Sequence, residues 1–105
     1  MIDSLLQCTG FEWDIHNSDK ITGKHGVTPV ECEQAFFNVP VVVGDDIKHS
    51  ETEARSYVLG QTNSGRLLFL VFTIRKDKIR VVSARDMNKK ERKVYESYEE
   101  KNSSV

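Results

Sequence analysis

The sequence predicts an α+β fold in which two short helices precede an antiparallel sheet meander and a C-terminal helix follows it. Three observations lead to this prediction. Residues 67–72 are apolar at every position, which is typical of a central strand covered on both faces. Thr28 stands three residues before Glu31, which is the spacing of a capped helix start. Asn88 and Glu91 repeat that spacing near the C-terminus.

The first predicted elements lie before Thr28. Phe11–Asp14 alternates apolar and polar residues, which favours a short strand that enters the core through its aromatic side chains. Asn17 is expected to cap a helix of about two turns. Gly26 then supplies the left-handed residue that ends this helix.

The second helix has the most complete local pattern. Thr28 is the expected N-cap, Pro29 occupies the first helical position and Glu31 closes a capping box. Asn38 and Pro40 are expected to stop the helix because proline cannot continue it.

Strands dominate the prediction after this helix. Residues 41–43 form a short apolar run, and residues 44–53 are polar and acidic, which indicates an exposed loop. Three antiparallel strands are then expected, with turn residues between them: 55–59, 66–74 and 79–84.

The last helix is predicted from Asn88 onward. Apolar side chains recur there at helical spacing, at Val94, Tyr95 and Tyr98. Residues 101–105 are expected to fray.

Composition predicts one globular domain over residues 1–105. The chain has 105 residues, of which 38% are hydrophobic and 30% are charged, so two separate cores would each be too small. No apolar run approaches the roughly 20 residues that cross a bilayer, and the N-terminus lacks a signal pattern. We therefore expect a cytoplasmic protein without a membrane segment. Cys8 and Cys32 have no metal-type spacing and are expected to be inert thiols.

The charges are unevenly distributed although the net charge is only -1. Residues 75–93 contain nine basic and three acidic side chains, whereas residues 31–55 contain six acidic and two basic ones. A basic segment suggests a polyanionic or acidic partner. A solvated charged face explains the same pattern and stays open.

No glycine-rich phosphate loop, metalloprotease helix, nucleophile elbow or zinc-type cysteine pair is present in the sequence. One acidic segment offers metal-binding side chains if it folds over itself, in a spacing that matches no standard site: Asp45, Asp46, His49 and Glu53. A metal-dependent nuclease is therefore one alternative, although no metal or other cofactor is expected.

A second group of side chains suggests RNA cleavage without a metal. Most of its members lie at or near predicted strand ends: Lys24, His25, Arg55, Arg75, Arg80 and Arg85. Such cleavage needs a group that takes the 2′-hydroxyl proton, cations for the phosphate and an acid for the leaving oxygen. His25 is the natural proton-transfer candidate, because an unperturbed histidine titrates near neutrality. Alternatively, His25 interacts with the last carbonyl groups of its helix.

Strict alternation along residues 79–84 limits this site. It places Arg80 and Arg85 on opposite faces, so both reach one site only if the strand ends or bulges near Ala84. Alternatively, Arg85 serves the last helix structurally. Trp13 and Tyr57 are candidates for stacking on bases. Such side chains more often belong to the core, and this is the favoured interpretation for Trp13.

The chain resembles the BrnT toxin family from about Phe11 to Tyr98. The resemblance rests on these residues: Phe11-Glu12-Trp13-Asp14, Asn17, Lys20, Lys24-His25-Gly26-Val27, Glu53, Arg55, Gly60, Gly65-Arg66-Leu67-Leu68-Phe69, Phe72-Thr73, Ile79-Arg80-Val81-Val82-Ser83-Ala84-Arg85, Glu91-Arg92 and Tyr95. Ile21 departs from the pattern, which leads us to expect asparagine at that position.

This resemblance implies a RelE-like fold, metal-independent RNA cleavage that inhibits translation, and neutralisation by a BrnA-type antitoxin. It also implies that operator DNA is contacted chiefly through the antitoxin. The site residues that it implies are Lys24, His25, Arg55, Arg80 and Arg85. A non-catalytic module of the same fold, which binds a partner or nucleic acid, is the alternative.

Overall fold

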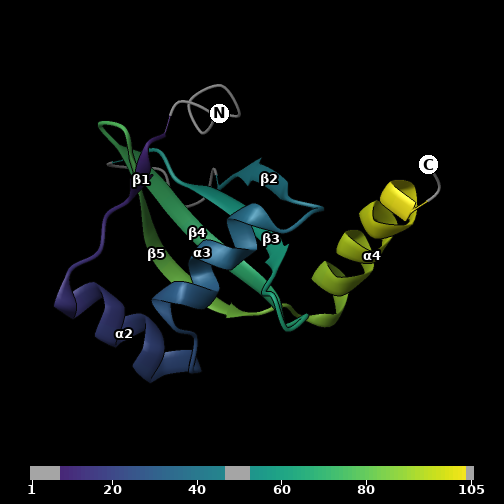
Figure 1. The fold of residues 1–105 in the computed structure, drawn as a ribbon, viewed down its shortest axis with the longest axis horizontal. Helices are drawn as coiled ribbons and strands as arrows, with labels where there is room; N and C mark the ends of the chain where they lie inside the picture. The colour runs from purple at the N-terminus through teal and green to yellow at the C-terminus, as the bar shows by residue number, and fades with distance from the viewer. Residues whose placement is uncertain (1–7, 47–52, 104–105) are drawn as a thin grey trace.

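The computed structural model describes residues 8–46 and 53–103 (Figure 1). Within these ranges the chain forms five strands and three helices, which confirms the α+β class. In chain order they are β1 (Gly10–Phe11), α2 (Ile15–His25), α3 (Pro29–Phe37), β2 (Val42–Asp45), β3 (Ser56–Gln61), β4 (Leu67–Arg75), β5 (Lys78–Asp86) and α4 (Lys89–Ser103). None of the described helices is long and apolar enough to span a membrane.

The five strands form one mixed sheet in the order β1-β5-β4-β3-β2. The predicted antiparallel meander is confirmed as β3-β4-β5, and the apolar strand β4 lies at its centre. β1 adds to the edge of β5 in parallel, with Phe11 opposite Ile79. Strand β2 begins one residue later than predicted and extends to Asp45. Residues 47–52 of the predicted loop lie outside the described residues.

The start of α2 differs from the prediction. Asp14, not Asn17, is the N-cap, because its extended backbone lets Oδ1 accept from the Asn17 amide at 2.7 Å. Helix α2 therefore has 11 residues. The predicted strand Phe11–Asp14 is correct only at Phe11, because β1 spans Gly10–Phe11. Asn17 instead donates its side-chain Nδ2 to the Val81 carbonyl of β5 at 2.9 Å.

The other predicted helix boundaries agree closely with the structure. Gly26 ends α2 in the left-handed conformation, with φ of 66°. Thr28 and Glu31 form the complete capping box of α3. Reciprocal hydrogen bonds between Asn88 and Glu91 begin α4, which continues to Ser103. The predicted fraying is therefore wrong for residues 101–103, and residues 104–105 lie outside the described residues.

The main core lies between α2, α3 and one face of the sheet. Its buried side chains are Ile21, Val27, Cys32, Ala35, Val58, Leu68, Leu70, Phe72, Ile79, Val81 and Ala84. Helix α3 lies across the sheet and α2 lies beside β5 (Figure 1). Trp13 packs against this core and donates its indole N–H to Glu33, so its predicted core role is confirmed. Burial raises the pKa of the Cys32 thiol to about 12.

Within the described residues, α4 covers the opposite face of the sheet at one end (Figure 1). There Tyr95 of α4 is fully buried with Leu59 and Met87, and its hydroxyl donates to the Pro40 carbonyl at 2.8 Å. The remaining length of α4 extends away from the sheet (Figure 1). In residues 8–46 and 53–103, no helix packs over the central part of this face, which we call the open face (Figure 1).

Candidate active site

A β-bulge in β5 decides which arginines share a sheet face. Arg80 pairs with Thr73 and Arg85 pairs with Phe69, two positions of β4 that are four residues apart. Four residues along a regular strand return to the same face. The register shifts between these pairs, because Val82 is the extra residue on β5. The prediction of strict side-chain alternation along β5 is therefore wrong. The alternative of a bulge is confirmed, at Val82 and so slightly before the expected position near Ala84.

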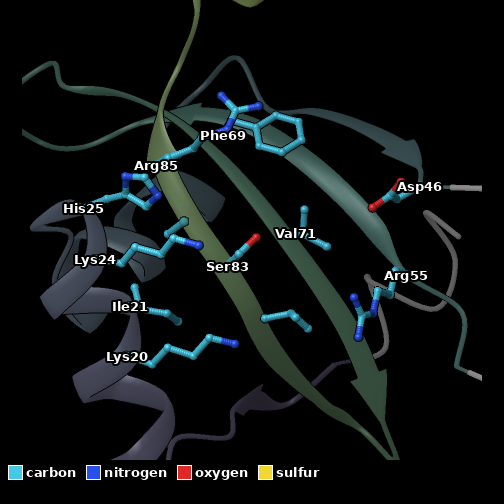
Figure 2. A pocket seen from close by; sticks show the side chains of 12 residues that line it. Lys20, Ile21, Lys24, His25, Asp46, Arg55, Phe69, Val71, Ser83 and Arg85 are labelled. Carbon is cyan, nitrogen blue, oxygen red and sulfur yellow. The ribbon is translucent and has the colours of Figure 1, made fainter. Parts of the chain in front are cut away.

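The open face carries a pocket of 530 Å³. We call it the basic pocket, and four predicted site residues line it: Lys24, His25, Arg55 and Arg85. Figure 2 shows Lys24 and Arg55 reaching toward it from opposite sides, across a floor that includes Val71 and Ser83. Lys20 adds a further cation, whereas Asp46 contributes a carboxylate. The pocket therefore gathers positive charge from α2, from β5 and from Arg55, the residue before β3.

Contacts on two sides position the Arg85 guanidinium. Nη1 and Nη2 donate to the two carboxylate oxygens of Glu91 at 2.8 and 2.9 Å. The guanidinium carbon also lies 4.2 Å from the centre of the Phe69 ring. Burial raises the pKa of Glu91, but the hydrogen bonds from Arg85 and the Asn88 amide together lower it by more than burial raises it. The net shift of this pKa is therefore downward. Arg85 therefore both anchors α4 and lines the basic pocket.

Arg80 does not line the basic pocket. Its Nη1 donates to Glu12 and its Nη2 to Asp14, each at 3.0 Å, and only 21% of its side chain is exposed. The Asn17 amide, followed by the Arg80 guanidinium, holds the pKa of Asp14 below its ordinary value. Since Asp14 caps α2, Arg80 ties the N-terminus of that helix to β5.

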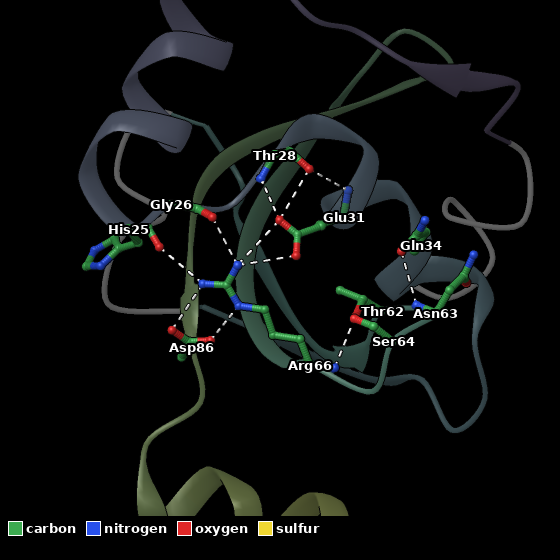
Figure 3. A network of polar contacts seen from close by, with 10 residues as sticks. All are labelled: His25, Gly26, Thr28, Glu31, Gln34, Thr62, Asn63, Ser64, Arg66 and Asp86. Carbon is green, nitrogen blue, oxygen red and sulfur yellow. Dashed lines mark hydrogen bonds and ion pairs between the residues drawn. The ribbon is translucent and has the colours of Figure 1, made fainter.

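Arg66 holds the other end of α2, as Figure 3 shows. Its guanidinium donates to the His25 carbonyl at 3.2 Å and to the Gly26 carbonyl at 3.0 Å. It also pairs with Asp86 at 2.8 Å and Glu31 at 3.3 Å. One side chain therefore joins α2, α3 and β5 next to His25, which lines the basic pocket.

Comparison with known proteins decides the family. A family model described as the ribonuclease toxin BrnT of type II toxin–antitoxin systems matches residues 13–91. The chain belongs to this family. No curated protein matches the sequence. Membership implies a ribonuclease toxin with an RNA target and an antitoxin partner.

In this BrnT chain, Ile21 is almost fully buried and packs in the main core beside the basic pocket. The side chain of Asn17, one turn earlier, supplies a polar contact between α2 and β5. At position 21, where this chain has isoleucine instead of the asparagine expected from the family pattern, an apolar side chain therefore lies between α2 and the sheet.

Part of the metal-binding alternative lies outside the described residues of this BrnT chain. No group of three or more His, Cys, Asp or Glu side chains in residues 8–46 and 53–103 is arranged to hold a metal ion. Glu53 forms an ion pair with Arg75 at 2.9 Å. His49 lies outside the described residues.

Sequence reasoning missed several residues that shape the site. Arg66 was part of the family resemblance without a role, and nothing local to Arg66 indicates its four partners. Phe69 lies under Arg85, and Ser83 lies in the floor of the basic pocket. The role of Phe69 could not be predicted, because every residue of its strand segment is apolar and the sequence does not show which of these side chains face the open side of the sheet.

Proposed function

We propose that this BrnT toxin is a metal-independent endoribonuclease that cleaves messenger RNA at the basic pocket and thereby inhibits translation. The observation that carries this proposal is the convergence of Lys24, His25, Arg55 and Arg85 on one open pocket. Lysine and arginine bind phosphate oxygens, and histidine transfers protons near neutral pH. These are the groups that RNA cleavage without a metal requires.

In the proposed reaction the 2′-hydroxyl oxygen attacks the adjacent phosphorus, and the P–O5′ bond breaks. A base removes the 2′-hydroxyl proton, and an acid gives a proton to the leaving 5′-oxygen. The products are a 2′,3′-cyclic phosphate and a 5′-hydroxyl end. His25 is the proposed proton-transfer residue, and the cations of the pocket stabilise the charge that develops on the phosphate oxygens.

Arg80 has a positioning role in this proposal, since Glu12 and Asp14 already accept its hydrogen bonds. It orients α2, which carries Lys24 and His25. The meander, with α2 and α3 against one face and α4 at one end of the other, supports a RelE-like fold. We propose one domain that acts in the cytoplasm, where messenger RNA is translated.

We also propose that a BrnA-type antitoxin neutralises the toxin by covering the basic pocket. The cationic lining would attract acidic side chains of a protein partner as well as phosphate groups. Contact with operator DNA would come chiefly through the antitoxin of this complex.

The test is cleavage of single-stranded RNA by the purified chain in the presence of EDTA. Activity should persist in EDTA, and Arg55→Lys should lower it on the order of 100-fold, because lysine lacks the paired donor geometry. Arg75→Lys is the matched control, because Arg75 pairs with Glu53 away from the basic pocket and should leave cleavage unchanged. Loss of activity in EDTA would favour the metal-dependent alternative.

One observation favours a second function, that of a non-catalytic binding module. Both terminal nitrogens of Arg85 already donate to Glu91, which leaves fewer donors for a phosphate. A chain that binds RNA tightly and leaves it intact under all conditions tested would support this function.

A further inference from the structure

A second hollow adjoins the basic pocket, and the two share the Phe69 side chain. We call it the aromatic groove. Its sheet side is formed by Tyr57, Leu59 and Phe69, and its helix side includes Lys90 and Val94 of α4. The groove has a volume of 260 Å³, about half that of the basic pocket.

Three side chains form a continuous row from the basic pocket into the aromatic groove. The Arg85 guanidinium lies over Phe69, and the Tyr57 ring stacks on Phe69 with centroids 5.7 Å apart and an interplanar angle of 18°. Gly44 makes room for this arrangement, because a Cβ atom there would come within 2.4 Å of the Tyr57 ring. The aromatic rings are thus held in a fixed orientation beside the cationic site.

We propose that the aromatic groove is a nucleobase subsite, which holds a base next to the cleaved phosphate and sets the base preference of the toxin. This inference rests on the proposed ribonuclease function. A strand of RNA offers phosphate and base alternately, and the structure places a cationic pocket and an aromatic groove side by side in the same way.

Three observations favour a base as the occupant. Aromatic side chains bind the flat faces of bases, which is the usual way that proteins hold single-stranded RNA. Lys90 gives the helix side a cation that can bind the next phosphate. The volume lies below the range of whole small-molecule sites, so the groove suits one ring system that is attached to a larger ligand. A side chain of the antitoxin is the competing occupant.

The test uses the purified full chain and a pool of short single-stranded RNA with randomised bases. Sequencing of the cleaved ends gives the base preference beside the cleavage site. Tyr57→Leu keeps an apolar side chain but removes the ring, whereas Val94→Trp fills the groove from the exposed surface of α4. Ser97→Trp adds the same ring on α4 at a position that does not line the groove. Melting temperatures of all variants confirm that they are folded.

We expect Tyr57→Leu and Val94→Trp to weaken the base preference and to raise KM for preferred RNA by about 10-fold, with the larger change in KM rather than kcat. Ser97→Trp should match the wild-type preference. If the wild type cleaves the pool and both variants keep its preference, the subsite is refuted and the ribonuclease function stands. The same result combined with loss of antitoxin affinity would assign the groove to the protein partner instead. A wild-type chain that leaves the pool intact refutes the proposed function together with the subsite.

Discussion

Replacement of Arg66 by methionine should destabilise the protein and disturb the basic pocket through His25, whose carbonyl Arg66 binds. The variant keeps an unbranched apolar stem but loses every polar contact of the guanidinium. It leaves Glu31 and Asp86 without their cation and the last carbonyls of α2 without a donor. The C-terminal turn of α2, which carries His25, therefore loses its connection to α3 and β5.

The contacts of Arg66 allow the size of this effect to be estimated. A hydrogen bond to a charged group contributes about 1.5–3 kcal/mol when it is well shielded. The Asp86 side chain is 54% exposed, so solvent screens its pair, whereas Glu31 is only 24% exposed. We therefore expect a total loss of about 2–3 kcal/mol rather than the sum of all contacts. In a domain of this size that corresponds to a melting temperature lower by about 10–15 °C.

The assay is thermal melting of Arg66→Met, Arg66→Lys and Arg75→Met beside the wild type. Arg66→Lys should fall between the wild type and Arg66→Met, because one ammonium group cannot replace the planar fork. Arg75→Met removes a more exposed pair and should cause a small fraction of the loss. If Arg66→Met melts like the wild type or like Arg75→Met, the role assigned to Arg66 is wrong.

Three further predictions concern stability. Gly60→Ala should lower the free energy of unfolding by about 1–3 kcal/mol, because its Cβ would lie 2.2 Å from a carbonyl oxygen of α3. Gly23→Ala, in open space on α2, should raise it by about 0.5–1 kcal/mol. Denaturant unfolding of the two variants measures both changes. Tyr95→Phe should cost about 1–2 kcal/mol in the same assay, since it removes a buried hydrogen bond that fastens α4. Hydrogen bonds from the Thr28 amide and then from Arg66 lower the pKa of Glu31 from 4.5. The ionised Glu31 therefore contributes fully to the free energy of unfolding above pH 4.5, and this contribution is lost as the pH falls further. The difference in melting temperature between wild type and Glu31→Gln should shrink below pH 4.5, and a constant difference would contradict this account.

The elements that the sequence predicted well depend on neighbouring residues. The capping boxes at Thr28 and Asn88 and the glycine end of α2 need only a few adjacent side chains, and all three are confirmed. The meander was predictable because short turns join its strands. The Asn17 cap was wrong because Asp14, three residues earlier, can accept the same kind of hydrogen bond, and local propensity does not separate the two.

The parts that could not be predicted depend on distant contacts. β1 joins β5 across 68 positions of sequence, and no local pattern indicates that partner. The bulge at Val82 appears in the sequence only as a possible interruption of alternation. Of the five predicted site residues, Arg80 alone does not line the basic pocket, because Glu12 and Asp14 bind it. Charge and strand position predicted an arginine near the site and could not show which carboxylates surround it.

The most direct test of the central claim compares two histidines on one helix. His25 lines the basic pocket, whereas His16 is exposed in the first turn of α2 and does not line it. Purified His25→Ala and His16→Ala are assayed with RNA in EDTA, the 2′,3′-cyclic phosphate ends are quantified, and melting confirms that both are folded. We expect His25→Ala to lower the rate on the order of 100-fold or more, while His16→Ala cleaves like the wild type. Equal rates for the two variants would show that proton transfer does not take place at His25 and would contradict the site proposed here.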